Sequence, residues 1–274
     1  MKTLLFADSW QQYFAGFGLD SFDDFYAYPR GTKIGKNRKR NVYRLTFGQG
    51  TEQRAFYVKR FTNPHLKDIL AARRNFGRVT SQARAEWNNT NLLNENGIDT
   101  YRPVCVGEQT LLGVERKSFL ITEELQSRCL LDFVLEKWRS LERSHQEAVV
   151  VSMAELARRV HRLDIALPDM YIWHFFIDED RLDHDCHLAI IDLHRMRRNV
   201  KSPLRKAADV GRLYWSLADD YFDSDLKDLL IRTYIRGAAK HALRVADAIR
   251  RRAELMKKRR ILEHHYNKPK PGSA

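Results

Sequence analysis

The stretch LPDMYIWHFFIDEDRLDHDCHLAIIDLHRM, residues 167–196, says more about the fold than any other part of the chain. It places Asp169 after an expected helix, His174 five positions later, and Asp192 after a second apolar segment. The two apolar segments are short and bounded by polar residues, a pattern that predicts a pair of strands. Asp169 and Asp192 therefore stand at the ends of regular elements, where they are the first candidates for a functional site.

The order of these residues follows a pattern found in kinases. There the catalytic loop carries an aspartate that accepts the proton of the acceptor hydroxyl, an asparagine five residues later holds a metal ion, and a second metal-binding aspartate follows the next strand. The spacing predicts Asp169 as the base and Asp192 as a ligand of Mg²⁺, which prefers oxygen. His174 stands at the asparagine position. Because imidazole is a poor Mg²⁺ ligand, we expect His174 to contact phosphate or simply to pack.

Two upstream residues complete the kinase order. Lys59 lies in FYVKRF, part of a hairpin expected from residues 41–47 and 54–61, and Glu86 lies 27 residues later in a helix expected over 80–98. Such a pair would hold the ammonium where it meets nucleotide phosphates. A lysine in a strand is often only a solvent-facing residue, so the prediction depends on all four residues occurring in order.

The expected elements divide the chain near residue 125. Before it, the hairpin and the helix are followed by two further strands around residues 100–109 and 117–125. After it, the sequence is mainly helical, and residues 147–163 place Val149, Met153, Leu156 and Val160 on one helical face. We predict an α+β fold with two lobes. Residues 1–125 would form a β-rich, nucleotide-binding N-lobe with the helix of Glu86. Residues 126–274 would form a mainly α C-lobe with the catalytic loop, the metal-binding aspartate and a basic C-terminal helix over about 241–266.

Positive charge is concentrated in two segments of this chain of 274 residues and net charge +13. Residues 30–44 hold seven Lys or Arg and no acid, and residues 238–274 hold eleven basic residues against three acidic ones. Either run could be a solvated face. The functional alternative is an anionic partner, such as nucleotide phosphates, an acidic membrane surface or nucleic acid.

The cysteines and the apolar runs bear on the compartment. Cys105, Cys129 and Cys186 are odd in number and widely spaced, which indicates a reducing compartment without a disulfide framework. No run suits a signal peptide or a membrane span, so we expect a cytosolic protein. The HDCH run at 184–187 suggests zinc, but its ligands are adjacent, and we favour a turn between two strands.

The segments DMYIWHFFID and IIDLHRM resemble the motifs of the Kdo/WaaP lipopolysaccharide kinase family, particularly its heptose-kinase branch. In that branch the catalytic aspartate is likewise followed five residues later by histidine and then phenylalanine. The resemblance implies ATP and Mg as cofactors and a protein-kinase-like fold. It further implies that Lys59 holds the α- and β-phosphates, Glu86 orients Lys59, Asp169 is the base and Asp192 holds the metal.

The resemblance also assigns roles outside these motifs. ITEEL, residues 121–125, resembles the segment that joins the lobes, whose backbone at Glu123 and Leu125 would bond the adenine. Asp209 resembles a buried carboxylate that braces the catalytic loop. The chain departs from the pattern in two places. Leu167-Pro168 replaces His-Arg before Asp169, and no glycine-rich phosphate loop is present, the nearest equivalent being the basic segment 30–41.

The substrate expectation rests on a short segment. Only 17 positions separate Asp192 from Asp209, too few for the activation loop of a protein kinase. An open site flanked by cations suits a bulky anionic acceptor, and the resemblance implies the lipopolysaccharide inner core, with heptose as the expected sugar. The basic C-terminal helix would meet the anionic inner face of the inner membrane, where we expect the protein to be peripheral.

The alternatives are a kinase of this fold acting on another small molecule or a protein, and a basic nucleic-acid-binding protein or pseudokinase scaffold. The complete set of four residues argues against a pseudokinase. No nucleic-acid partner is expected, because no DNA-binding motif or interleaving of aromatic and basic residues is present.

Overall fold

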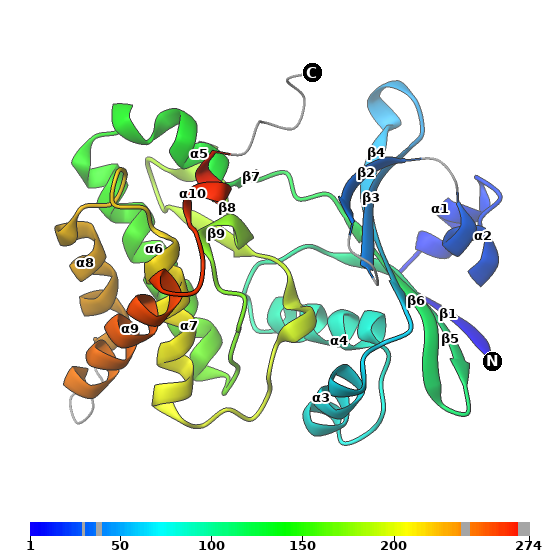
Figure 1. Cartoon of the computed structure of the whole chain (residues 1–274). Helices are drawn as coiled ribbons and strands as arrows, with labels where there is room; N and C mark the ends of the chain where they lie inside the picture. Colours follow the sequence, from blue (N-terminus) through cyan, green and yellow to red (C-terminus); the bar gives the residue numbers. More distant parts are fainter. Residues whose placement is uncertain (29–30, 37–39, 237–241, 268–274) are drawn as a thin grey trace. The chain divides into compact units, whose positions relative to one another are not determined.

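The computed structural model describes residues 1–28, 31–36, 40–236 and 242–267. The chain forms two compact units, Met1–Leu125 and Gln126–Ala274 (Figure 1). The first is built on an antiparallel sheet and the second is mainly helical.

A six-stranded antiparallel sheet organises the first unit, in the order β1-β5-β6-β4-β3-β2. Its strands are β1 (Lys2–Phe6), β2 (Thr32–Lys36), β3 (Arg40–Phe47), β4 (Arg54–Thr62), β5 (Pro103–Leu111) and β6 (Val114–Glu123). Its helices are α1 (Trp10–Ala15), α2 (Phe22–Ala27), α3 (Leu66–Phe76) and α4 (Gln82–Glu95). The expected hairpin is β3–β4, and the two further strands are β5 and β6. The edge strands β1 and β2 were not predicted.

The alternation of strand β4 decides where Lys59 points. Phe56 and Val58 belong to an aromatic core with Phe14 of α1 and Phe25 of α2. Because successive side chains of a strand point to opposite faces, Lys59 points away from that core. Helices α1 and α2 lie on one side of the sheet and α4 on the other (Figure 1). The sequence pattern of β4 therefore directs Lys59 toward α4.

Helix α4 begins as its sequence predicts. Ser81 is the N-cap, and its side chain accepts a hydrogen bond from the Arg84 amide. After the helix, Gly97 has φ +66, a conformation that glycine adopts at little cost. Glu86 lies in the second turn, fully buried against the sheet.

The second unit places helices around a small antiparallel sheet in the order β7-β8-β9. Its strands are β7 (Arg128–Cys129), β8 (Phe175–Asp178) and β9 (His187–Ile190). Its helices are α5 (Leu130–Lys137), α6 (Arg143–Arg162), α7 (Pro203–Ser216), α8 (Ser224–Ile235), α9 (Ala242–Lys257) and α10 (Glu263–Tyr266). Strands β8 and β9 are the predicted pair, and the HDCH run lies in the connection between them and at the start of β9.

Two helical faces can be compared with the sequence pattern. The four predicted apolar residues of α6 are all buried, which confirms that face. The C-terminal region differs from the prediction, because α9 ends at Lys257 and a separate short helix, α10, follows. Helical spacing over 241–266 predicts one apolar face with Val245, Ile249, Leu255 or Met256, and Ile261. In the structure Met256 is buried, Leu255 is 44% exposed, and Ile261 lies beyond the end of α9.

Among the described residues, no helix combines the length and the apolar character that crossing a membrane requires.

Candidate active site

The first unit carries a buried ion pair between Lys59 and Glu86. Lys59 Nζ lies 2.5 Å from Glu86 Oε1, and the side chains are 12% and 0% exposed. A buried carboxylate needs a charged or hydrogen-bonding partner, and the lysine supplies it. The structure thus brings together two residues that were paired on sequence order alone.

Tyr101 is a third member of this cluster that the sequence did not reveal. Its hydroxyl donates to Glu86 Oε1, and Lys59 Nζ lies 5.0 Å from the centroid of its ring. Tyr101 follows α4 in the connection to β5, and no sequence pattern links a tyrosine there to the pair. In the described part of the chain, Glu86 Oε2 has no hydrogen-bond partner, so Oε1 carries both bonds.

The segment 121–125 ends β6 and contains the two residues expected at the adenine. The Glu123 amide donates to the Arg102 carbonyl at 2.9 Å, so that N–H is engaged within the unit. Glu123 is the last residue of β6, whereas Leu125 lies beyond the strand. Both side chains are partly exposed. An adenine bound at this segment would use the Glu123 carbonyl or the Leu125 amide, a role that stays a prediction from the resemblance.

Glu124, between them, belongs to an ion pair that was not predicted. Arg44 Nε and Nη2 donate to its two carboxylate oxygens at 2.6 and 2.7 Å, and the Tyr57 hydroxyl donates to Oε1 at 3.1 Å. The hydrogen bond from Arg44 lowers the pKa of Glu124. This bidentate ion pair connects the end of β6 to β3.

In the second unit, the loop that carries Asp169 is braced by α7. The buried carboxylate of Asp209 in α7 accepts the Leu167 amide at 2.7 Å, and its other oxygen accepts Arg212 Nη1 at 2.7 Å. A backbone bridge joins Ala166 to Arg197, with both N–H to O distances 2.9 Å. Although Leu167-Pro168 replaces His-Arg, the loop is held by backbone bonds that do not depend on those side chains.

The carboxylate of Asp169 has two different environments. Oδ1 accepts Arg195 Nη1 at 2.8 Å, whereas Oδ2 is buried and has no hydrogen-bond partner among the described residues. A buried oxygen without a partner is costly, and such atoms in a native structure often mark a functional role. The arrangement suits an oxygen that must accept a proton.

His174 connects the loop of Asp169 to the residues that follow β9. Its Nδ1 donates to the Asp169 carbonyl at 2.6 Å, which leaves Nε2 3.7 Å from Asp192 Oδ2. Its own carbonyl accepts the Ile191 amide at 2.9 Å. The histidine thus bonds the Asp169 carbonyl and lies near Asp192, and its expected contact with phosphate stays a prediction.

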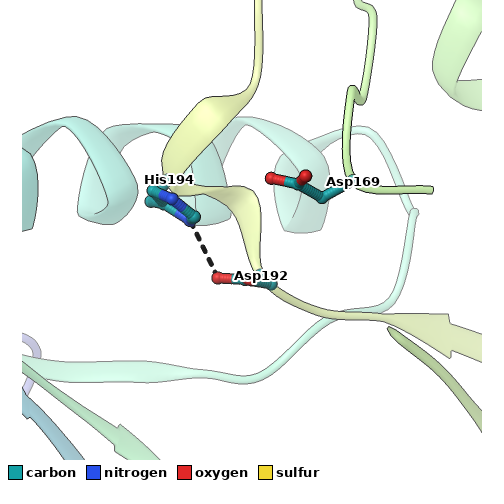
Figure 2. Close-up of side chains that lie close together, drawn as sticks. All are labelled: Asp169, Asp192 and His194. Atoms are coloured by element: carbon teal, nitrogen blue, oxygen red, sulfur yellow. Dashed lines mark hydrogen bonds and ion pairs between the residues drawn. The ribbon is translucent and has the colours of Figure 1, made fainter. Parts of the chain in front are cut away.

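Asp192 follows β9 in a left-handed conformation, with φ +64 and ψ 59. Residues other than glycine adopt this region at a cost, and such outliers are often found at functional sites. The turn directs its carboxylate toward His194, whose Nδ1 lies 2.9 Å from Asp192 Oδ1. Figure 2 shows these two side chains beside Asp169.

Asp169, Asp192 and His194 could together hold a metal ion. One ligand atom from each lies within 4.8 Å of the others. The two carboxylates supply the hard oxygen donors that Mg²⁺ prefers, whereas the imidazole of His194 is a poorer ligand for this ion. The two aspartates therefore fit a divalent cation. In the described ranges no other such cluster is found, and the HDCH run forms none.

The basic segment 30–41 lies partly outside the described residues. Arg30, Arg38 and Lys39 are among the residues not described, so the expected substitute for a phosphate loop stays a prediction.

These features define a class of protein. A β-sheet unit with a Lys–Glu pair and a helical unit with two loop aspartates form a protein-kinase-like fold, and a solved structure of WaaP in complex with acyl carrier protein shares it. That structure aligns with a TM-score of 0.70 and 24% identity, covering 93% of this chain and 99% of the other.

The chain belongs to the lipopolysaccharide kinase (Kdo/WaaP) family, whose model matches residues 30–234. It is 31% identical over 167 residues to the lipopolysaccharide core heptose(I) kinase WaaP of Pseudomonas aeruginosa, covering 59% of this chain and 62% of that relative. It is 26% identical over 195 residues to the protein of the same name from Escherichia coli, covering 65% and 74%. The match thus spans less than two thirds of the Pseudomonas relative. The resemblance seen in the sequence motifs is confirmed at the level of the family.

Proposed function

We propose that this protein is an ATP-dependent kinase that transfers the γ-phosphoryl group to a sugar hydroxyl of the lipopolysaccharide inner core, with heptose as the sugar. The observation that carries the proposal is the Asp169 carboxylate. One of its oxygens is buried without a hydrogen-bond partner among the described residues, and the carboxylate clusters with Asp192 and His194, one ligand atom of each lying within 4.8 Å of the others. The relatives named as heptose(I) kinases support the choice of acceptor.

The proposed reaction is a single displacement. The acceptor hydroxyl gives its proton to Asp169 while its oxygen forms a bond to the γ-phosphorus. The bond between that phosphorus and the β,γ-bridging oxygen breaks, and ADP leaves. The protein supplies position and charge stabilisation more than covalent chemistry.

Residues of the first unit would bind the nucleotide. Lys59 would hold the α- and β-phosphates, and Glu86, supported by Tyr101, would keep its ammonium in place. The Glu123 carbonyl and the Leu125 amide would bond the adenine.

Residues of the second unit would serve the metal and the proton. Asp192 would hold Mg²⁺, which when bound neutralises phosphate charge. His174 would contact phosphate through Nε2, since its Nδ1 is used by the Asp169 carbonyl.

The short segment after Asp192 supports a site that needs no phosphorylation switch. It consists of one 3-10 turn, Leu193–Arg195, and the residues that lead into α7 at Pro203. A protein kinase needs a longer activation loop there, which favours a sugar acceptor over a protein.

We also propose a membrane-surface role for the C-terminal cations. Arg250, Arg251, Lys257, Lys258 and Arg259 are all exposed. Among them, Arg250 pairs with Asp228 and Lys257 with Glu254. Cations near an anionic leaflet contribute about 1 kcal/mol each. They would concentrate the protein on the cytoplasmic face of the inner membrane, where a lipid-linked acceptor is found.

The experiment is phosphoryl transfer by purified protein with ATP, Mg²⁺ and core lipopolysaccharide that lacks heptose phosphate. Asp169→Asn should keep its nucleotide affinity and lose about 10²–10⁴-fold in kcat, the usual contribution of a general base. Asp192→Asn should instead weaken Mg-dependent nucleotide binding in calorimetry. Turnover near that of the wild type in Asp169→Asn would refute the assignment of the base.

A further inference from the structure

Two neighbouring side chains of the short turn Leu193–Arg195 each bind a carboxylate. His194 Nδ1 lies 2.9 Å from Asp192 Oδ1, and Arg195 Nη1 lies 2.8 Å from Asp169 Oδ1. One turn therefore bonds both aspartates that the proposed function uses. The sequence pattern assigned no role to His194 or Arg195.

The backbone of this turn is fixed on both sides. Leu193 is 0% exposed and Met196 is 1% exposed, so buried side chains flank the pair. The next residue, Arg197, forms the backbone bridge with Ala166, three positions before Asp169. Arg195 is thus attached to a segment that is bonded to the loop of Asp169.

The Arg195 contact gives the two oxygens of the Asp169 carboxylate different environments. Oδ1 is held by the guanidinium, while Oδ2 is buried and has no partner in the described part of the chain. A carboxylate with neither oxygen bonded can rotate about its last side-chain torsion, which is broad. A charge-assisted bond to one oxygen restricts that rotation and leaves the other oxygen in a defined direction.

We propose that Arg195 is a positioning residue that fixes Asp169 so that Oδ2 receives the acceptor's proton. This inference rests on the proposed function, in which the acceptor oxygen then bonds to the γ-phosphorus and ADP departs. Arg195 acts through Asp169 and needs no contact with substrate. The opposing explanation is an ordinary surface ion pair, since the Arg195 side chain is 54% exposed.

The two explanations differ in steady-state kinetics. Arg195→Gln should lower kcat by up to about 10²-fold, because a small misplacement of a catalytic group has an effect of that size. The KM values for ATP and acceptor and the melting temperature should stay close to those of the wild type. Arg195→Lys should lie between the two, and millimolar guanidinium should restore part of the turnover of Arg195→Ala.

A double-mutant cycle tests whether Arg195 acts through Asp169. Adding Arg195→Gln to Asp169→Asn should cause no further loss of kcat, because the group that it positions is already impaired. An equal fold-loss in both backgrounds would overturn the proposal. Arg181→Gln is the matched control, since the Arg181 side chain is similarly exposed and pairs with an aspartate of the same unit, Asp185, outside the candidate site. It should leave kcat unchanged.

The outcomes separate this inference from the proposed function. If the wild type transfers no phosphoryl group, or if Asp169→Asn is as active as the wild type, the proposed function fails. If Asp169→Asn is impaired while Arg195→Gln keeps the wild-type kcat, only the role of Arg195 is refuted.

Discussion

Tyr101 controls the environment of the Lys59–Glu86 pair. Its hydroxyl donates to the same Glu86 oxygen that binds the lysine, and its ring lies beside the ammonium. We predict that Tyr101→Phe lowers the free energy of unfolding by about 1–2 kcal/mol, since a buried acceptor loses one donor. The loosened pair should raise the KM for ATP several-fold.

Urea unfolding and steady-state kinetics check this prediction. Tyr26→Phe is the control, because it removes another hydroxyl of the same unit, bonded to the Phe61 carbonyl and to Thr62. It should reduce stability without changing the KM for ATP. An unchanged KM in both variants would contradict the role given to Tyr101.

Glu124 gives the first unit a pH-dependent contribution to stability. Because Arg44 lowers its pKa in the folded state, the contribution is present above the unfolded pKa of the glutamate. It is lost as the pH falls through the lower, folded pKa. We predict that Glu124→Gln destabilises the protein by about 1 kcal/mol at pH 7, the upper range for partly exposed pairs. The difference from the wild type should shrink in acid, and urea titrations at several acidic pH values would measure it. A difference that does not change with pH would contradict the prediction.

In the second unit, the segment that follows α9 packs against residues between Asp169 and His174. The His265 ring stacks on Trp173 with centroids 3.8 Å apart, and Arg260 Nη1 donates to the Tyr171 hydroxyl at 3.3 Å. The Tyr266 hydroxyl donates to the Ser216 carbonyl at 2.7 Å, and Ser216 Oγ accepts the Ile172 amide at 2.9 Å.

Tyr266→Phe should therefore affect the loop from a distance. The hydroxyl also accepts the Ala218 amide at 3.1 Å, so its removal leaves two backbone groups without a bond. We predict a loss of about 1–3 kcal/mol in the free energy of unfolding and a lower kcat. Chemical denaturation and the transfer assay measure both. Tyr221→Phe, whose ring stacks on Tyr266, should have a smaller effect on each. Equal effects would argue against the hydrogen bonds as the cause.

The sequence predicted those helices and strands that carry a strong local pattern. The alternation around Lys59, the cap at Ser81 and the apolar face of α6 each specify an element locally. Strands β1 and β2 were not predicted. Each is an edge strand whose pairing with its neighbour is created by the fold and leaves no strong local pattern in the sequence. The prediction of one long C-terminal helix was wrong, because helical spacing cannot show that the chain leaves α9 after Lys257 and packs Arg260 on Tyr171.

The candidate site was predictable where it follows a linear spacing. Asp169, His174 and Asp192 were found from their order, and the structure places them close together in one unit. Tyr101, Arg195 and the Arg44–Glu124 pair were not found, because each joins residues distant in sequence through a contact that only the fold creates. His194 was visible beside Asp192, but adjacency did not indicate a bond between the two side chains.

For the protein as a whole, the net charge of +13 favours anionic partners. We predict that replacing Arg251, Lys258 and Arg259 with Gln reduces sedimentation with vesicles of anionic lipid. Arg260 is left intact because it contacts Tyr171. Raising the salt concentration should have the same effect as the substitutions. Transfer to a soluble, delipidated acceptor should be unchanged. Vesicle binding that ignores these three residues would refute the surface role.

The phosphate content of core lipopolysaccharide, measured by mass spectrometry, tests whether this protein is a core heptose kinase. A strain that lacks the protein should lose one phosphate from a core heptose. The wild-type gene should restore that phosphate, and the Asp169→Asn gene should not. An unchanged phosphate content in the deletion strain, or full restoration by Asp169→Asn, would contradict the proposed function.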